Sequence, residues 1–431
     1  MNNIVLIMEL KYPSNYISKI NSFFYKLGFI ACITLALSVE ISTAGTTISF
    51  SIIYICFLLT GEWKKKFILL KNPVIVIAIT FWLWILISGL LGNASPHDSW
   101  VIIGKYSKVF LIWALLYFID FQDKRFYIIL IACITGIVAN ILVIYINYFI
   151  LPTQHAIAFN NPGWPSPQNH FVFAFFTLVF SFGCFIFATS KKFTHNHRIA
   201  LLLVGLIALV AEVFLNSART GYVMELIVII VLYTIRYRLK GLVFSILFAC
   251  ALFFTAYHIS PIFKQRVDAA ASSYVHYKAN KGTVKTSTGL RMYFNEISFG
   301  IIKDDPYKMV LGNGSGSYPW LASKYVKNHQ SILPKLYRSD STWNPENQYL
   351  LLIIENGVVG LILFLSIFLA FIIYCKKHCP YNYYLLSICL SIGMLVGCLF
   401  SSWFRDLGPS LLFLTYCSLI MQSAKKNHKV S

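Results

Sequence analysis

The sequence predicts an all-α, polytopic membrane protein, because its composition, its apolar runs and its charge distribution all point to that class. Of its 431 residues, 58% are hydrophobic and only 12% are charged, and the mean hydropathy is +0.68. Soluble globular proteins carry roughly 25% charged residues. Apolar runs of about 17–25 residues recur along the chain, and such runs are long enough to cross about 30 Å of hydrocarbon.

Twelve of these runs are predicted to be membrane-spanning helices. They cover residues 22–41, 44–60, 73–92, 105–119, 127–150, 169–189, 198–215, 221–235, 241–259, 347–374, 382–402 and 408–422. We therefore expect a membrane domain over residues 1–259, a hydrophilic segment over 260–346, and a second membrane domain with a tail over 347–431. Residues 1–21 lack an apolar region followed by small residues, so we expect no cleaved signal peptide.

The formal net charge of +20 is explained largely by membrane topology. With a cytoplasmic N-terminus, the short outer loops hold only Lys105, Arg219 and Arg405. The basic residues of the predicted inner loops and tail are Lys64, Lys65, Lys66, Lys71, Lys124, Arg125, Lys191, Lys192, Arg198, Arg236, Arg238, Lys240, Lys376, Lys377, Lys425, Lys426 and Lys429. This positive-inside pattern predicts an inner-membrane protein with both termini in the cytoplasm, and it implies no nucleic-acid partner.

The ten cysteines do not form a recognisable metal motif. Most of them lie inside predicted spans or near the inner face. Cys375 and Cys379 flank His378, but no second pair of ligands completes a zinc site. We expect the cysteines to act as small apolar residues, and we expect no metal and no cofactor.

The segment 260–346 is predicted to lie on the outer, periplasmic side. It contains twelve Lys or Arg and six Asp or Glu residues, which leaves a charge of +6. An excess of positive charge suits an anionic partner, such as a lipid phosphate or a phosphorylated sugar.

Two motifs stand out within this segment. The stretch "STGLRMYFNEISFGIIKDDP" predicts a helix of about four turns, with Ser287 or Thr288 as N-cap and Asp304-Asp305-Pro306 as stop. Leu290, Tyr293, Ile297 and Ile301 share one face of that helix. In "MVLGNGSGSYPW", Gly312, Gly314 and Gly316 alternate with other residues, which permits positive φ angles and close approach to a ligand. A plain flexible turn explains the glycines equally well.

Three arginines are predicted at outer membrane boundaries. Arg219 begins the eighth span, with Ser217 or Thr220 as cap; Arg291 lies in the first turn of the loop helix; Arg405 precedes the last span. A helix N-terminus and a guanidinium group together make an anion site, so two such ends suit a diphosphate. The structural alternatives are contact with lipid headgroups for Arg219 and Arg405, and an ion pair with Glu296 for Arg291.

Buried carboxylates are predicted to be few, and they are Glu40, Glu212 and Glu225. Ionisable groups within spans are functional candidates. Glu212 and Glu225 lie about two turns on either side of Arg219, so they are expected to pair with it or to position it. A proton-coupled transporter is expected to have more such groups and broken helices, which ranks transport below catalysis.

Glu346 lies where the hydrophilic segment enters an apolar run, in "STWNPENQYLLL". The structural interpretation makes Asn344 the N-cap, Pro345 the first helical residue and Glu346 a first-turn acid. The functional interpretation makes Glu346 a general base that accepts the proton of an attacking hydroxyl group. His170 and His329 are alternative bases on the outer side.

Five motifs, in this order and topology, resemble the O-antigen ligase and polymerase superfamily. They are "NSARTGYV", "TGLRMYF", "VLGNGSGSY", "NPENQYLLLIIENGVVGLILF" and "SSWFRDLG". The resemblance covers roughly the C-terminal half and the overall number of spans. It implies a metal-independent, inverting glycosyltransferase that moves O-polysaccharide from undecaprenyl diphosphate to a sugar of the lipid A–core at the periplasmic face.

The same resemblance assigns site residues. Arg219 and Arg291 match the family's diphosphate ligands, and the corner around Glu346 and Asn347 matches its catalytic corner; the family usually has His where this chain has Glu346. Arg405, Asn347 and the three glycines are further candidates for substrate binding. O-antigen ligase is the leading prediction, and the alternatives are O-antigen polymerase, a protein O-oligosaccharyltransferase, and a non-enzymatic transporter or flippase.

Overall fold

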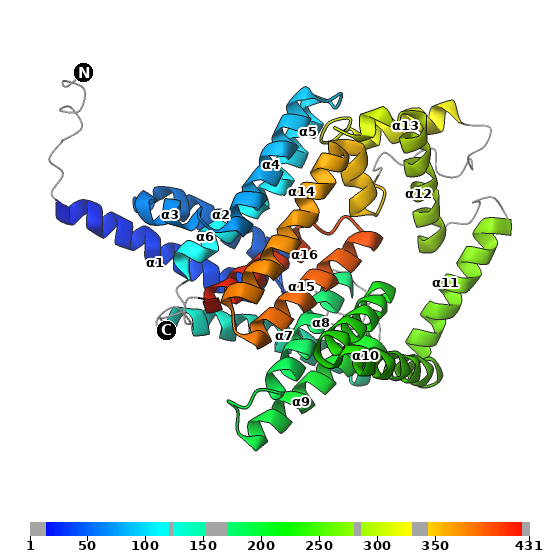
Figure 1. Cartoon of the computed structure of the whole chain (residues 1–431), viewed down its shortest axis with the longest axis horizontal. Coiled ribbons are helices and arrows are strands. Elements are labelled where there is room, and N and C mark those ends of the chain that lie inside the picture. Colours follow the sequence, from blue (N-terminus) through cyan, green and yellow to red (C-terminus); the bar gives the residue numbers. More distant parts are fainter. Residues whose placement is uncertain (1–13, 120–123, 152–169, 280–285, 330–343, 425–431) are drawn as a thin grey trace.

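The computed structural model describes residues 14–119, 124–151, 170–279, 286–329 and 344–424 (Figure 1). Regular structure within these ranges is helical throughout, which confirms the all-α class. The helices are α1 (Ser14–Ser38), α2 (Thr43–Leu59), α3 (Trp63–Leu69), α4 (Pro73–Leu91), α5 (Pro96–Tyr106), η2 (Ser107–Phe110), α6 (Leu111–Phe118), α7 (Lys124–Phe149), α8 (His170–Ala188), α9 (His195–Val210), η4 (Ala211–Leu215), α10 (Arg219–Ile259), α11 (Pro261–Ala279), α12 (Ser287–Asp304), η5 (Tyr307–Met309), α13 (Tyr318–Asn328), α14 (Gln348–His378), α15 (Tyr381–Phe400) and α16 (Leu407–Gln422).

Within the described ranges, nine helices are long and apolar enough to cross a membrane. The bent pair α2 and α3, which meet at 116°, makes a tenth candidate if the two are counted as one span. The chain is therefore a polytopic membrane protein. α16, predicted as a span, is shorter than these helices and is buried along nearly its whole length. The predicted span 105–119 belongs to a longer helical run that begins at Pro96.

The long element α10 consists of two helices that fold back on each other at Arg238, whose φ is +55°. The rings of Tyr233 and Phe244 lie 5.5 Å apart between centroids, although a straight helix would separate these residues by about 16 Å along its axis. The two predicted spans 221–235 and 241–259 are thus the two arms of a helical hairpin.

α14 is interrupted at Gly357, which has a φ of +72°. A Cβ atom at this position would lie 2.3 Å from the carbonyl oxygen of Val310, so only glycine fits there. The expected single span over 347–374 is therefore wrong in one respect. Residues before Gly357 form a separate short helix, and the long helix follows the break.

The segment 260–346 carries three described α-helices, α11, α12 and α13, and the short helix η5, on the right-hand side of Figure 1. Only α12 was predicted. Tyr293, Ile297 and Ile301 are buried on one face of α12 and Leu290 is partly buried, as predicted. Together with side chains of α13 and the start of α14, they form a second hydrophobic core. This core holds the segment against the start of α14.

The N-cap of α12 is Thr286 and not Ser287 or Thr288. The Thr286 hydroxyl oxygen accepts a hydrogen bond from the backbone N–H of Gly289 at 3.0 Å. The helix ends at Asp304, as predicted from the Asp304-Asp305-Pro306 stop.

Candidate active site

Arg219 is the first residue of α10, and the N-cap is Ala218 in place of the expected Ser217 or Thr220. The turn before it is fixed by Asn216, whose side-chain amide donates to Glu212 at 2.7 Å and to the carbonyl oxygen of His170 at 3.1 Å. The guanidinium group of Arg219 leaves this turn and donates to the Thr288 hydroxyl oxygen at 2.8 Å. The arginine therefore points from the membrane domain to the first turn of α12.

Among the described residues, Arg219 forms no ion pair with Glu212 or Glu225, although such a pair was one of the expectations. Both carboxylates are buried, and Glu212 is engaged by Asn216. Arg219 instead lies within electrostatic range of two other guanidinium groups, those of Arg266 on α11 and Arg291 on α12. The result is a cluster of three arginines contributed by three helices.

Arg291 connects this cluster to Glu346. Its Nε atom lies 3.1 Å from the Oε2 atom of Glu346, and its guanidinium group lies over the ring of Phe171, 5.6 Å from the centroid. The side chains are only partly covered, with exposed fractions of 18% for Arg291 and 36% for Glu346. Glu346 replaces Glu296 as the partner of Arg291, since Glu296 accepts a hydrogen bond from Tyr277. A ligand can therefore reach the Arg291–Glu346 pair.

Glu346 does not lie in the first turn of a helix. α14 begins at Gln348, and its N-cap is Asn347, whose Oδ1 atom accepts from the backbone N–H groups of Tyr349 and Leu350. Glu346 precedes the cap with a φ of +50°, a left-handed conformation that is unfavourable for a residue with a Cβ atom. Such strain persists where surrounding contacts impose it, and it is concentrated at functional sites.

Neighbouring side chains hold this strained corner. The Oδ1 atom of Asn344 accepts from the backbone N–H of Glu346 at 3.3 Å and from the hydroxyl group of Ser402 at 2.8 Å. Asn344 therefore fixes the corner in place of capping the helix. The Oδ1 atom of Asn347 is engaged in capping α14. A role of Asn347 in substrate binding stays a prediction.

Gly312, Gly314 and Gly316 all have positive φ angles, as their sequence pattern allowed. A Cβ atom at Gly312 would lie 2.4 Å from the carbonyl oxygen of Glu355, and one at Gly314 would lie 2.5 Å from the Cα atom of Gly92. The loop is joined to α14 by a hydrogen bond from the N–H of Gly314 to the carbonyl oxygen of Glu355 at 2.8 Å. Close packing against protein backbone thus explains the glycines, and their contact with substrate stays a prediction.

Arg405 belongs to a second charged group on the other side of Glu346. Its Nη1 atom lies 3.9 Å from the Oε1 atom of Glu355, a fully buried carboxylate that also accepts from the backbone N–H of Tyr318. Lys108 donates to the backbone carbonyl oxygens of Arg405 and Asp406. Burial raises the pKa of Asp406 above its ordinary value, and the neighbouring Lys108 and Arg405 oppose that rise.

His170 and His329, the two alternative candidates for the general base, lie in different parts of the structure. His170 begins α8 and is within electrostatic range of Arg219, Arg266 and Arg291. His329 follows α13, where its Nδ1 atom lies 3.0 Å from the carbonyl oxygen of Tyr325. Of these two, His170 is the one placed near the arginine cluster.

Sequence reasoning did not identify Arg266 or Glu355 as site residues. Arg266 appeared only as one of twelve basic residues in its segment. Glu355 lies in "IIENGVVG", inside a predicted span, and is therefore a further carboxylate of the predicted spans. The Asn-Gly pair directly after it was the local signal of a break in the helix.

No group of three or more His, Cys, Asp or Glu side chains that could hold a metal ion occurs among the described residues. The positive charge at the candidate site comes from guanidinium groups. Operation without a metal stays a prediction.

The fold and the site define a polytopic membrane protein with an arginine cluster and a strained carboxylate at one end of its helical bundle. A family model described as "O-Antigen ligase" matches residues 203–365, so this part of the chain is similar to that family. The matched residues include Arg219, Arg291 and Glu346, and exclude Arg405.

A protein of Haemophilus influenzae, described as "Uncharacterized protein", is 27% identical to this chain over 208 residues. The alignment covers 47% of this chain and 50% of the relative. The chain thus matches about half the length of that protein.

Proposed function

We propose that this protein is a glycosyltransferase of the O-antigen ligase type, which transfers O-polysaccharide from undecaprenyl diphosphate to the lipid A–core. We place it in the bacterial inner membrane, with the Arg219 end of the bundle facing the periplasm. The observation that carries the proposal is the placement of Arg219, Arg291 and Glu346 around the first turn of α12. The family match over the same residues supports it.

In this proposal Arg219 and Arg291 bind the diphosphate of the donor. Guanidinium groups form paired, charge-assisted hydrogen bonds with phosphate oxygens. When the donor binds, Arg291 turns from Glu346 to the diphosphate, which frees the carboxylate. The guanidinium groups then stabilise the charge that develops on the leaving diphosphate, in the role that a divalent ion has in other transferases.

Glu346 is proposed as the general base. The acceptor hydroxyl oxygen attacks the anomeric carbon of the donor sugar, and its proton passes to Glu346. The bond from the anomeric carbon to the diphosphate oxygen breaks as the new glycosidic bond forms on the opposite face. The configuration at that carbon is therefore inverted, and undecaprenyl diphosphate is released.

The test is transfer by the purified chain, supplied with the lipid-linked donor and lipid A–core. Ligase activity gives a product with polysaccharide on the core, and it is expected to persist in EDTA. Loss of transfer in EDTA, with recovery on adding Mg²⁺ or Mn²⁺, would show that a metal does the work assigned to the arginines. No transfer under any condition would favour a transporter.

O-antigen polymerase is the second candidate, because the family match and a diphosphate-binding site are consistent with the same donor. A deletion strain distinguishes the two. Loss of a ligase leaves bare lipid A–core and strands the glycan on its carrier, whereas loss of a polymerase leaves core capped with a single repeat unit.

A further inference from the structure

Lys105 is a lysine without an ionic partner on a helix that is long enough to cross the membrane. The sequence placed it in a short outer loop. In the structure it belongs to the apolar helical run Pro96–Phe118, about 14 Å along the axis from Pro96. Its side chain is exposed, and it forms no hydrogen bond or ion pair within the described ranges. Ionisable groups within spans are costly, and they mark substrate paths or pair with other groups.

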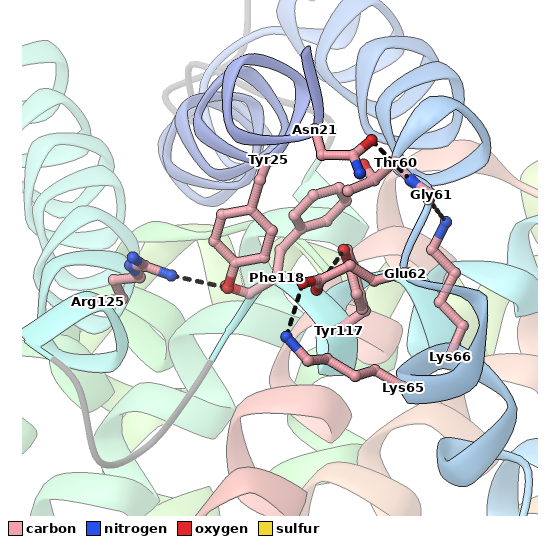
Figure 2. Close-up of polar contacts among 10 residues, drawn as sticks. All are labelled: Asn21, Tyr25, Thr60, Gly61, Glu62, Lys65, Lys66, Tyr117, Phe118 and Arg125. Carbon is pink, nitrogen blue, oxygen red and sulfur yellow. Dashed lines mark hydrogen bonds and ion pairs between the residues drawn. The ribbon is translucent and has the colours of Figure 1, made fainter. Parts of the chain in front are cut away.

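Two lysines at the bend between α2 and α3 show the contrast (Figure 2). The ammonium group of Lys65 lies 2.7 Å from a carboxylate oxygen of Glu62. Lys66 is fully buried, and its ammonium group donates to the carbonyl oxygen of Thr60. Each of these charges is met within the chain. The charge of Lys105 is not, so its ammonium group is available to a ligand.

The charged groups around Lys105 leave an excess of positive charge. Lys105 lies within electrostatic range of Arg405, Asp406 and Glu355. The fifth member of this group, Lys108, donates to the backbone carbonyl oxygens of Arg405 and Asp406. Three cations thus stand against two carboxylates, and Arg405 already has Glu355 at 3.9 Å. The surplus positive charge suits an anionic ligand.

Lys105 lies beside the corner that holds Glu346. Tyr106, the next residue of α5, accepts a hydrogen bond from the side-chain amide of Gln348 at 2.7 Å. Gln348 is the first residue of α14 and follows Glu346 by two positions. The start of α14 is therefore contacted from α5 next to Lys105, whereas Arg291 reaches Glu346 from α12.

The exposed side of α5 also carries apolar side chains. Val101, one turn before Lys105, is 42% exposed, and the neighbouring Trp100 is 59% exposed. Tryptophan is enriched where a span meets the interface between headgroups and hydrocarbon. An anionic group held at Lys105 thus has apolar surface on the same helix, as an amphipathic lipid requires.

We propose that Lys105 binds a phosphate group of the acceptor glycolipid, and that the exposed side of α5 guides this lipid to Glu346. The inference rests on the transfer reaction proposed above. In an inverting reaction the acceptor attacks from the face opposite the leaving group. Because the diphosphate is assigned to Arg219 and Arg291, the acceptor needs a separate approach to Glu346, and the α5 side supplies one. Lys105 binds the acceptor and takes no part in the proton transfer.

The test is steady-state transfer by the full-length purified chain with two acceptors, lipid A–core with its phosphate groups and the same lipid after their removal. Lys105→Gln should raise the KM for the phosphorylated acceptor about tenfold, the effect of losing one charge-assisted contact. The kcat and the KM for the donor should not change, because the lost contact is equal in ground state and transition state. Lys105→Arg keeps the charge and should restore most of the affinity. With the dephosphorylated acceptor, Lys105→Gln and the unmodified chain should have equal KM.

Equilibrium binding of the two acceptors, measured by native mass spectrometry without donor, separates this inference from the proposed function. A chain that prefers the phosphorylated acceptor through Lys105 but transfers nothing supports the glycolipid site and contradicts the transferase. A chain that transfers glycan with the same acceptor KM in every variant supports the transferase and overturns the site.

The matched control is Lys303→Gln, which removes the same charge from an exposed lysine in the last turn of α12. It should change neither the acceptor KM nor the donor KM. Thermal melting of each variant identifies any loss of folding. An equal rise in KM for both acceptors in Lys105→Gln would show that Lys105 does not bind the phosphate. Dioleoyl phosphatidylglycerol that competes with the acceptor at equal concentration would identify a general contact with lipid headgroups and overturn the proposal.

Discussion

Two arginine–glutamate pairs flank the start of α14, and they differ in exposure and in what holds them. Arg291 and Glu346 meet at 3.1 Å with exposed fractions of 18% and 36%. Arg405 and Glu355 lie 3.9 Å apart, and Glu355 is completely buried beneath the glycine loop. Glu346 has a strained backbone and one ionic partner, whereas Glu355 is joined to the fold through its side chain and its backbone.

The difference separates a pair that a substrate can open from a pair that the fold requires. The two arginines are covered to a similar extent, so the contrast lies in the carboxylates: Glu346 is 36% exposed and Glu355 is fully buried. An ion pair that solvent reaches contributes about 0–1 kcal/mol to stability, so exchanging its partner for a substrate costs little. Breaking a buried pair leaves an uncompensated charge, which costs about 3–5 kcal/mol. We therefore propose that Glu346 takes part in the reaction and that Glu355 stabilises the fold.

The largest expected effect is on transfer, at Glu346. Glu346→Gln keeps the size of the side chain and removes its ability to accept a proton, so the transfer rate should fall by a factor of about 10²–10⁴. Glu346→His should retain more activity than Glu346→Gln, because imidazole can accept the same proton. Rates are compared at matched membrane levels of each protein. A Gln variant within a few-fold of the unmodified chain would exclude Glu346 as the base.

Next in size is the stability effect at Glu355. Glu355→Ala should lower the free energy of unfolding by about 3–5 kcal/mol, because it removes a fully buried carboxylate and leaves the largely covered Arg405 without its partner. Glu346→Ala is the matched control and should cost under about 1 kcal/mol. Thermal melting in detergent measures both. If the two alanine variants melt at the same temperature, the contrast between the pairs is wrong.

The arginines of the partly buried cluster should affect transfer more than folding. Arg219→Ala and Arg291→Ala are each expected to lower the transfer rate by about 10²–10³, the usual cost of losing one group that stabilises developing charge. Lysine should restore little, since it lacks the planar fork of donors. Near-normal transfer by either alanine variant would rule out the proposed diphosphate clamp.

A smaller effect is expected where the glycine loop packs against the membrane domain. Gly314→Ala adds a Cβ atom 2.5 Å from the Cα atom of Gly92 at a φ of +107°, so it should destabilise the protein by about 1–3 kcal/mol. The control is Gly104→Ala in α5, where nothing lies within 4 Å of the added atom. That variant should melt at the same temperature or higher. Equal melting of both would mean that the loop tolerates a side chain.

The smallest effect concerns Asp406, next to Arg405. Burial raises its pKa in the folded protein, so the neutral carboxyl group favours folding. That contribution is complete below the unfolded pKa of about 3.9 and is lost as the pH rises through the folded pKa. Asp406→Asn removes this dependence, so the melting temperature of the unmodified chain should fall relative to that of the variant as the pH rises above about 4. If the variant instead becomes more stable relative to the unmodified chain as the pH falls, the predicted direction of the pKa shift of Asp406 is wrong.

Features set by local periodicity were predictable from the sequence. The spans follow from uninterrupted apolar runs, and the buried face of α12 follows from the spacing of Tyr293, Ile297 and Ile301. The sequence also marked Arg219, Arg291 and Glu346 individually. It did not show that α12 brings them together, because Thr288 and Glu346 lie 69 and 55 residues from the arginines that they contact.

The exact start of α14 was not predictable, because two positions have equally good helix-capping residues. Asn344 and Asn347 are both good N-cap residues, and Pro345 fits a first helical turn, so the sequence favoured the earlier start. In the structure Ser402 donates to Asn344, a contact across 58 residues, and Asn347 becomes the cap. That tertiary contact is also what places Glu346 outside the helix.

The contact between the glycine loop and α14 also sets an order of events during synthesis. Glu355 is made 43 residues after Gly312, which at about 5–20 residues per second is a delay of roughly 2–9 seconds. Until α14 emerges, the left-handed glycines and the second hydrophobic core lack the surface that they pack on. A nascent chain that stops before Gln348 thus carries Arg219 and Arg291 while the surface that holds α12 and the glycine loop is still missing. Assembly of the candidate active site therefore waits for the tenth predicted span.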